Sequence, residues 1–214
     1  MKIYEYKDYD EYLQMQMKAN HQKMDNVWVH RTTIAAIVNF YRRNIGEPKK
    51  VLCHGTRNGA EMFFFKKHLD NWDLDILGTE ISDTAHFFGH TVQWDMQKPK
   101  QEWVGQWDII YSNSIDHCLD PVECLTTWRD QLTEGGLLVV DHSVWLDKHN
   151  VKPNKTDCLD MSFEELEDLF EQLEMVVEGK RPFKENLGHK KKQVESWFYF
   201  VRRKDESRES MGHD

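Results

Sequence analysis

Short apolar runs and longer amphipathic segments alternate along the chain from residue 50 to residue 204. Strands that are joined by helices usually run parallel, and a parallel sheet is covered by helices on both faces. The alternation therefore predicts an α/β fold with a mostly parallel sheet. The expected strands are residues 51–54, 73–79, 91–94, 107–112, 137–140, 175–178 and 197–202.

Helix signals lie between these strands. Ser162 and Glu165 have the spacing of a capping box, and so do Asn58 and Glu61, although such a box usually begins with Ser or Thr. A proline follows Asp120 at a position that suits the first turn of a helix. These signals predict helices over residues 58–69, from residue 121 to the glycines at 135–136, behind residue 162, and a short one from residue 82.

The first 47 residues differ from the rest of the chain. A helix is expected at about residues 12–24, and a second one is expected to start at Thr32 or Thr33, because apolar side chains then follow at helical spacing. We expect residues 1–47 to form a helical extension that covers the active site. Residues 48–204 should form one domain, and residues 205–214 a disordered tail.

The segment 143–161 contains Pro153 and has no clear period. It is long for a connection in a compact domain, and such connections are often functional. Trp145 in this segment, and Trp28 before the second helix, are candidates to cover a bound acceptor. For Trp28 a simple packing role is the competing interpretation.

Composition excludes several classes of protein. The net charge is −9, which disfavours a phosphate backbone as partner, and the basic runs at 190–192 and 202–204 are better explained as solvated edges. The four cysteines have no metal-binding spacing. No apolar run approaches the ~18 residues of a membrane span, and the polar start is not a signal peptide. We expect a cytoplasmic monomer or homodimer, with neither nucleic acid nor membrane as partner.

A glycine-containing turn follows the first expected strand, in the sequence VLCHGTRNG. Ligands of parallel sheets bind beyond the carboxyl ends of the strands, where the winding order reverses. Gly55 and Gly59 let the chain bend sharply there and let a ligand approach the backbone. Two glycines alone are a weak signal.

Two acidic residues at later strand ends strengthen it. Glu80 ends the second strand, 21 residues after Gly59, where a carboxylate can accept both hydroxyls of a ribose. Asp95 ends the third strand, where it could accept the exocyclic amine of an adenine. The alternatives are that Glu80 only favours the start of the next helix and that Asp95 is a solvated strand-end acid.

The ordered series VLCHGTRNG, TEIS, QWDM, WDIIYSNSIDHCLDP and LTEGGLLVVDHS resembles the class I S-adenosylmethionine-dependent methyltransferases over residues 48–204. The resemblance is closest to the small-molecule branch with an SxxEHxxDP segment. It implies a Rossmann-like sheet of seven strands with an antiparallel last strand. It also implies that S-adenosylmethionine is held by His54, Gly55, Thr56, Arg57, Gly59, Glu80, Ile81, Asp95, Met96, Ser112, Asn113, Ser114 and His117.

The resemblance is imperfect at two positions. Cys53 stands where the family usually has an acid that helps to hold the cofactor's ammonium group, and Arg57 stands where it usually has glycine. A backbone carbonyl of His54 or Gly55 would then have to accept the ammonium. Arg57 either points outward or pairs with the cofactor's carboxylate as a fork.

Methyl transfer from a sulfonium depends mainly on alignment, and a base helps only when the acceptor must lose a proton. The candidate bases are Asp116, His117 and His142, and the competing interpretation is that they only position other groups. The motif of DNA amino-methylating enzymes is absent, and no set of metal ligands is visible, so we expect no metal. A small molecule is the expected acceptor.

Two alternatives remain open. The first is a non-catalytic cofactor-binding module, which the residues at positions 53 and 57 would favour. The second is a dinucleotide-dependent oxidoreductase, which predicts a GxGxxG turn that GTRNG does not supply.

Overall fold

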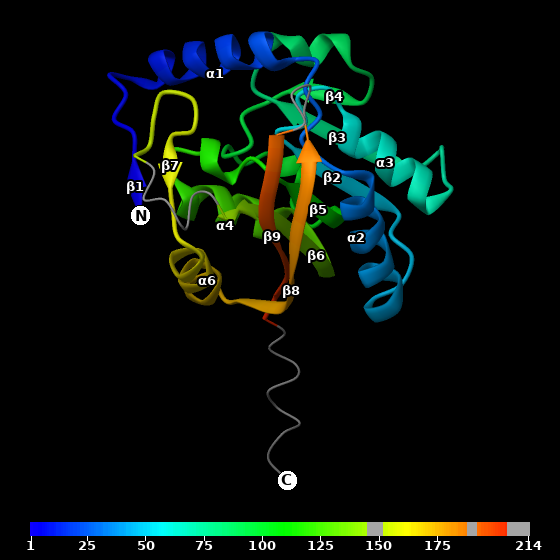
Figure 1. Cartoon of the computed structure of the whole chain (residues 1–214). Coiled ribbons are helices and arrows are strands. Elements are labelled where there is room, and N and C mark those ends of the chain that lie inside the picture. Colours follow the sequence, from blue (N-terminus) through cyan, green and yellow to red (C-terminus); the bar gives the residue numbers. More distant parts are fainter. Residues whose placement is uncertain (145–151, 188–191, 205–214) are drawn as a thin grey trace.

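A computed structural model describes residues 1–144, 152–187 and 192–204. Its main sheet has seven strands in the order β4-β3-β2-β5-β6-β9-β8 (Figure 1). The strands are β2 (Lys50–His54), β3 (Asp75–Glu80), β4 (Thr91–Gln93), β5 (Trp107–Ser112), β6 (Leu132–Ser143), β8 (Met175–Leu187) and β9 (Lys192–Arg203).

The first five of these strands are parallel, and β9 is inserted antiparallel between β6 and β8. The predicted α/β class and the antiparallel last strand are therefore confirmed. Strand β2 lies between β3 and β5, so the winding reverses at its carboxyl end. Such a switch point is where open α/β sheets bind ligands.

Helices cover both faces of the sheet. On one face lie α2 (Arg31–Asn44) and α3 (Ala60–Leu69), and on the other lie α4 (Pro121–Gln131) and α6 (Phe163–Gln172) (Figure 1). Because side chains alternate along a strand, β5 supplies Ile109 and Tyr111 to the α2–α3 core and Ile110 to the α4–α6 core. The apolar period of the sequence predicted this two-sided burial.

Helix α1 (Tyr9–Lys23) lies across the end of the sheet at which the parallel strands finish (Figure 1). Asp8 caps it by accepting from the N–H of Glu11. The short strand β1 (Lys2–Ile3) pairs with β7 (Leu159–Asp160), so the start of the chain is attached to the segment before α6. No helix in the described part is long and apolar enough to cross a bilayer.

Three of the predicted helix starts are confirmed, and two are wrong. Ser82 caps the short 3₁₀ helix Asp83–Phe87, as expected from residue 82. Helix α2 begins at Arg31 after His30, whose Nδ1 accepts from the Thr32 N–H, and not at a threonine cap. Asp120 caps α4, and Ser162 forms a complete capping box with Glu165. Gly59, with φ 71°, precedes α3 instead of a capping box from Asn58. The Asn58 amide donates to carbonyls of the α1–α2 connection, and the Glu61 side chain is buried.

The end of α4 also differs from the expectation. The helix was predicted to reach the glycines at 135–136, but it stops at Gln131, and β6 starts at once with Leu132 opposite Trp107. The pairing of β5 with β6 shifts register between Trp107 and Ile109, so Leu132 pairs with Trp107 while Leu137 pairs with Ile109. Leu132 is fully buried as the first residue of β6. An inward-facing residue of a last helical turn would also be apolar, so its character could not distinguish the two.

Candidate functional site

A cavity opens between the carboxyl ends of the strands and α1. It encloses about 560 Å³ of empty space, including its mouth. Of the residues predicted to bind a cofactor, eight line it: Gly55, Arg57, Glu80, Ile81, Asp95, Met96, Ser114 and His117. They come from four separate segments of the chain, so the fold brings together what the sequence motifs only ordered.

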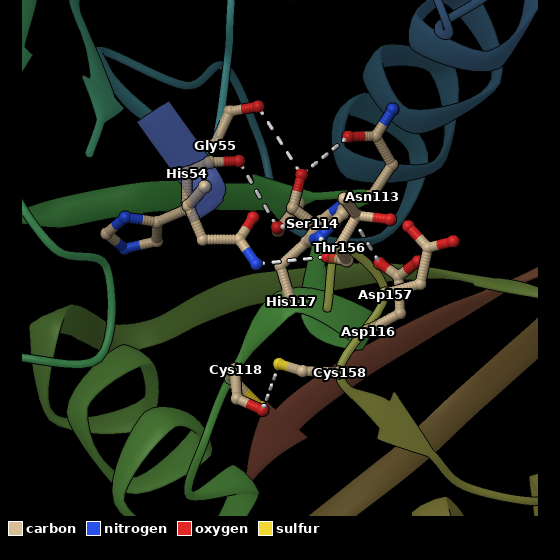
Figure 2. Close-up of polar contacts among 12 residues, drawn as sticks. His54, Gly55, Asn113, Ser114, Asp116, His117, Cys118, Thr156, Asp157 and Cys158 are labelled. Atoms are coloured by element: carbon tan, nitrogen blue, oxygen red, sulfur yellow. Dashed lines mark hydrogen bonds and ion pairs between the residues drawn. The ribbon is translucent and has the colours of Figure 1, made fainter. Parts of the chain in front are cut away.

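The turn after β2 allows a ligand to reach the backbone. Gly55 has φ 69°, and a Cβ there would lie 2.5 Å from the Oγ of Ser114. The Ser114 Oγ is also 3.4 Å from the Gly55 carbonyl oxygen and 3.2 Å from the Asn113 Oδ1 (Figure 2). Glycine is therefore required at position 55 both for its backbone conformation and for its close neighbour.

Glu80 is held with its carboxylate beside this turn. Its two oxygens accept from the backbone N–H groups of Arg57 and Ser82, both at 3.0 Å. The side chain is 5% exposed, and burial raises its pKa while these N–H groups oppose the rise. Each carboxylate oxygen retains a lone pair, which can accept a ribose hydroxyl.

Asp95 lies at the other end of the cavity. Its Oδ2 accepts from the Tyr9 hydroxyl of α1 at 2.7 Å, and its Oδ1 accepts from the Gln97 N–H at 3.0 Å. Burial and the neighbouring carboxylate raise the pKa of Tyr9, which keeps this hydroxyl a donor. The position suits an adenine amine, but α1 already occupies one of the acceptor sites.

Arg57 has a left-handed backbone, with φ 48°, and its side chain reaches the cavity. Its Nε is buried and donates to no described group. Burial lowers the pKa of the guanidinium, and the charges of Glu80 and Glu61 counteract this. A buried guanidinium with an unused donor can pair with a ligand carboxylate, as expected for the methionine part of the cofactor.

His117 has a fixed orientation. Its Nδ1 lies 2.6 Å from the carbonyl oxygen of Thr156, which can only accept, so Nδ1 carries a proton (Figure 2). In the neutral ring Nε2 is then an acceptor, and it lies 3.8 Å from Asp116 Oδ1. Gln16 of α1 donates to the same Thr156 carbonyl at 3.0 Å. In the neutral ring the nitrogen without a proton is therefore Nε2.

Three possible metal ligands meet beside this histidine. Asp116, His117 and Asp157 each offer one atom, and these atoms lie within 4.8 Å of one another (Figure 2). Asp157 belongs to the segment 143–161, which has no clear period, so its position beside Asp116 and His117 was not predicted. The absence of a metal thus stays a prediction, because the donor set could hold a divalent cation.

The inner face of α1 contributes residues that sequence reasoning missed. Tyr12, Gln16, Ala19, Asn20 and Lys23 line the cavity. Gln16 and Asn20 are buried although they are polar. A helix that buries polar residues has no apolar stripe to detect. This explains why none of these residues was predicted, although the N-terminal extension was expected to cover the site. Thr79 and Trp94 also line the cavity and were not predicted.

The other predicted residues lie outside this cavity. The His54 imidazole is buried in the α4–α6 face, between Thr79 Oγ1 and Gln131 Oε1, each at 2.9 Å. Burial lowers its pKa to about 4, so it is neutral at ordinary pH. Its carbonyl accepts from the Ser112 hydroxyl at 3.2 Å. Each of the two carbonyls considered for the cofactor's ammonium therefore already accepts from one serine hydroxyl, that of Gly55 at the longer distance of 3.4 Å.

His142 is buried on the α4–α6 side and meets the Met161 carbonyl oxygen at 2.7 Å through Nε2. His142 does not line the cavity, so nothing around it supports the predicted role of a base, which stays a prediction. Four further predicted residues do not line the cavity but lie in or beside the segments that follow β2 and β5: Thr56, Gly59, Ser112 and Asn113. Trp145 lies outside the described residues.

The strand order, the inserted antiparallel strand and the cavity at the switch point define a Rossmann-like fold of the class I methyltransferase type. No protein-family model and no curated protein matches the chain. Solved structures do match it.

One is the 1,6-didemethyltoxoflavin-N1-methyltransferase of Burkholderia thailandensis with bound 1,6-didemethyltoxoflavin and S-adenosylhomocysteine. It is similar at a TM-score of 0.64 and 12% identity, over 94% of this chain and 92% of that one. A plantazolicin methyltransferase, in complex with a triazolic desmethylPZN analogue and S-adenosylhomocysteine, has a TM-score of 0.62 at 11% identity, over 91% of this chain and 96% of that one.

A S-adenosylmethionine-dependent methyltransferase from Archaeoglobus fulgidus has a TM-score of 0.57 at 14% identity, over 80% of this chain and 93% of that one. These similarities show the fold, and they leave the acceptor undetermined. The particular SxxEHxxDP branch expected from the sequence stays a prediction.

Proposed function

We propose that the protein is an S-adenosylmethionine-dependent methyltransferase that acts on a small-molecule acceptor. The observation that carries this proposal is the single cavity that joins the Gly55 turn, Glu80 and Asp95. Three successive strand ends thus present a close-approach turn, a ribose acceptor and an adenine acceptor to one ligand.

The residues present fit the cofactor at each part. Glu80 accepts from the ribose, while Ile81 and Met96 enclose the adenine and Asp95 accepts from its amine. Arg57 pairs with the carboxylate. A backbone carbonyl of the turn, that of His54 or Gly55, accepts from the ammonium, because Cys53 offers no charge there. When bound, S-adenosylmethionine supplies an electrophilic methyl group on its sulfonium.

His117 is the base in this proposal. Its Nε2 accepts the proton of a hydroxyl or N–H acceptor, and Asp116 stabilises the imidazolium that results. The Thr156 carbonyl keeps the ring in the required tautomer. A non-catalytic binding module would need no such oriented acceptor atom, so this contact favours the enzyme.

Two experiments test the proposal. Calorimetric titration with S-adenosylmethionine, S-adenosylhomocysteine and NAD should show binding of the first two only, and binding of NAD alone would overturn the proposal. Incubation with methyl-labelled cofactor and fractionated metabolite extracts should then label a small molecule. Cofactor binding without transfer to any fraction would favour the non-catalytic module.

His117→Asn tests the base. Asparagine keeps a polar group of similar reach but cannot take a proton at neutral pH. Transfer to the labelled acceptor should fall by a factor of about 10² to 10⁴, far more than any change in the Kd for S-adenosylhomocysteine. Undiminished transfer would remove His117 from the chemistry.

A further inference from the structure

Helix α1 holds the candidate base at two points. The Tyr12 hydroxyl donates to the backbone carbonyl oxygen of His117 at 3.0 Å. Gln16 lies one helical turn further along the same face of α1, and its Nε2 donates to the Thr156 carbonyl oxygen at 3.0 Å. The His117 Nδ1 is 2.6 Å from that same oxygen (Figure 2). One helix therefore contacts both the backbone of His117 and the group that orients its ring.

The Thr156 carbonyl oxygen is shared by two donors. A carbonyl oxygen has two lone pairs, and the described residues supply His117 Nδ1 for one and Gln16 Nε2 for the other. The Gln16 side chain is 7% exposed, so water has little access to replace its amide. The amide of Gln16 therefore fixes the direction in which this oxygen presents its remaining lone pair to His117.

The turn around Thr156 leaves its carbonyls for partners outside the turn. The Asn154 Oδ1 accepts from the N–H groups of Thr156 and Asp157 at 2.9 and 3.1 Å, as in an Asx turn. The carbonyl of Lys155 accepts from the Tyr6 hydroxyl at 3.0 Å. The N-terminal extension thus holds two successive carbonyls of this turn, the first through Tyr6 and the second through α1.

Two acceptors compete for the single ring proton of neutral His117. The Thr156 carbonyl attracts the proton to Nδ1, whereas the Asp116 carboxylate, 3.8 Å from Nε2, attracts it to Nε2. Free histidine also carries this proton mainly on Nε2. A hydrogen bond from Nδ1 to a fixed oxygen reverses that preference, because it favours the tautomer that can donate there. The unprotonated Nε2 thus depends on how firmly the Thr156 carbonyl is held.

We propose that Gln16 is a positioning residue for the base: by holding the Thr156 carbonyl, it keeps the neutral His117 ring in the tautomer whose Nε2 can accept a proton. The use of this tautomer in catalysis rests on the proposed function. Gln16 takes no proton itself and acts through Thr156. A glutamine that lines the cavity from α1 thereby belongs to the machinery of proton transfer, in addition to covering the site.

Nitrogen-15 NMR of the histidine rings tests the proposal without an acceptor substrate. At pH 8.5 an ordinary imidazole is neutral, and the shifts of its two nitrogens report the ratio of the tautomers. The signals of His117 are those that disappear in His117→Asn. Gln16→Met keeps the length and the helix propensity of the side chain and removes its donor. Gln16→Leu does the same if Gln16→Met does not fold.

Two variants serve as matched controls. Gln22→Met makes the same replacement at an exposed position of α1. Tyr9→Phe removes a different contact of α1, the hydrogen bond to Asp95, and so tests whether a general loosening of the helix is enough to change the ring.

We expect the Nδ1-protonated tautomer of His117 to predominate in the unmodified protein. In the Gln16 variants the ratio of the Nδ1-protonated to the Nε2-protonated ring should fall by about two- to tenfold, the range that one ordinary hydrogen bond corresponds to. In Gln22→Met and Tyr9→Phe the ratio should not change.

An unchanged ratio in the Gln16 variants, an equal change in Tyr9→Phe, or a mainly Nε2-protonated ring in the unmodified protein would overturn the proposal. Calorimetry with S-adenosylhomocysteine separates this inference from the proposed function. If that ligand does not bind the unmodified protein while Gln16→Met alters the tautomer as expected, the positioning role stands and the proposed function fails. If the ligand binds and the ratio is unchanged, the positioning role alone fails.

Discussion

The Glu61 carboxyl is a buried acid whose ionisation should oppose folding. It is 5% exposed, and burial raises its pKa from 4.5 to about 7 against the weaker effects of its own N–H and of Arg57. Glutamine has the same shape and no charge. Glu61→Gln should therefore stabilise the protein without ligand at alkaline pH, although it removes a charged group.

The direction follows from proton binding. Between pH 4.5 and about 7 the native Glu61 holds a proton that the unfolded chain has lost, so the free energy of unfolding falls as pH rises through this window. A pKa raised from 4.5 to about 7 corresponds to ~3 kcal/mol once both states are ionised. Because Glu61→Gln also removes the attraction between Glu61 and Arg57, ~3 kcal/mol is an upper value for the gain in stability. The variant and the unmodified protein should be equally stable near pH 4.5 and differ most above pH 7.

Urea unfolding at pH 5, 6, 7 and 8, followed by tryptophan fluorescence, measures the difference. The raised pKa of Asp141 is common to both proteins and cancels in it. Glu171→Gln, on an exposed surface of the helical layer, is the matched control and should show no such trend. A difference between Glu61→Gln and the unmodified protein that is independent of pH, or that grows toward acid, would refute the burial of an uncompensated carboxyl.

Three further outcomes are expected. Gly55→Ala and Gly59→Ala should each cost ~1–2 kcal/mol, because both positions have a left-handed backbone. Only Gly55→Ala also places its Cβ 2.5 Å from a serine hydroxyl, so it should be the less stable variant in urea unfolding. Equal stabilities of the two variants would contradict this. Glu80→Ala should weaken S-adenosylhomocysteine binding by ~1–3 kcal/mol in calorimetry, and an unchanged Kd would remove Glu80 from the site. Tyr9→Phe loses the hydrogen bond to Asp95, worth ~0.5–1.5 kcal/mol, so α1 should detach from the sheet more often and trypsin should cleave it sooner. An unaltered rate of cleavage would show that this bond does not hold the helix.

Much of the fold was predictable because the period of apolar residues reflects which side of an element is buried. Strand β5 was placed at its observed bounds, and the caps at Asp120 and Ser162 formed as their side-chain chemistry requires. The predicted ends of helices and strands were wrong where a residue would be buried equally well in a helix and in a strand. Leu132 is an example, since it fits the last turn of α4 and the first position of β6 equally well.

The site residues at the ends of the sheet strands could be predicted from the sequence, whereas those that other segments bring to the site could not. Gly55, Glu80 and Asp95 could be found because each follows a strand, and the ends of parallel strands meet at one edge. Gln16 and Asp157 could not, because they reach the site by the docking of α1 and of a segment with no period. Both segments were expected near the site, but nothing in either local sequence states which side chains would face it.

The unusual residue at position 53 becomes intelligible when Glu61 is considered with it. The Cys53 side chain is fully buried on the α2–α3 face, where burial and the charge of Glu61 raise the pKa of its thiol and keep it neutral. An acid at position 53 would place a second carboxylate against a first one that is already short of positive charge. Both could not ionise in that environment. With Glu61 on α3, a neutral residue at position 53 of β2 is therefore required.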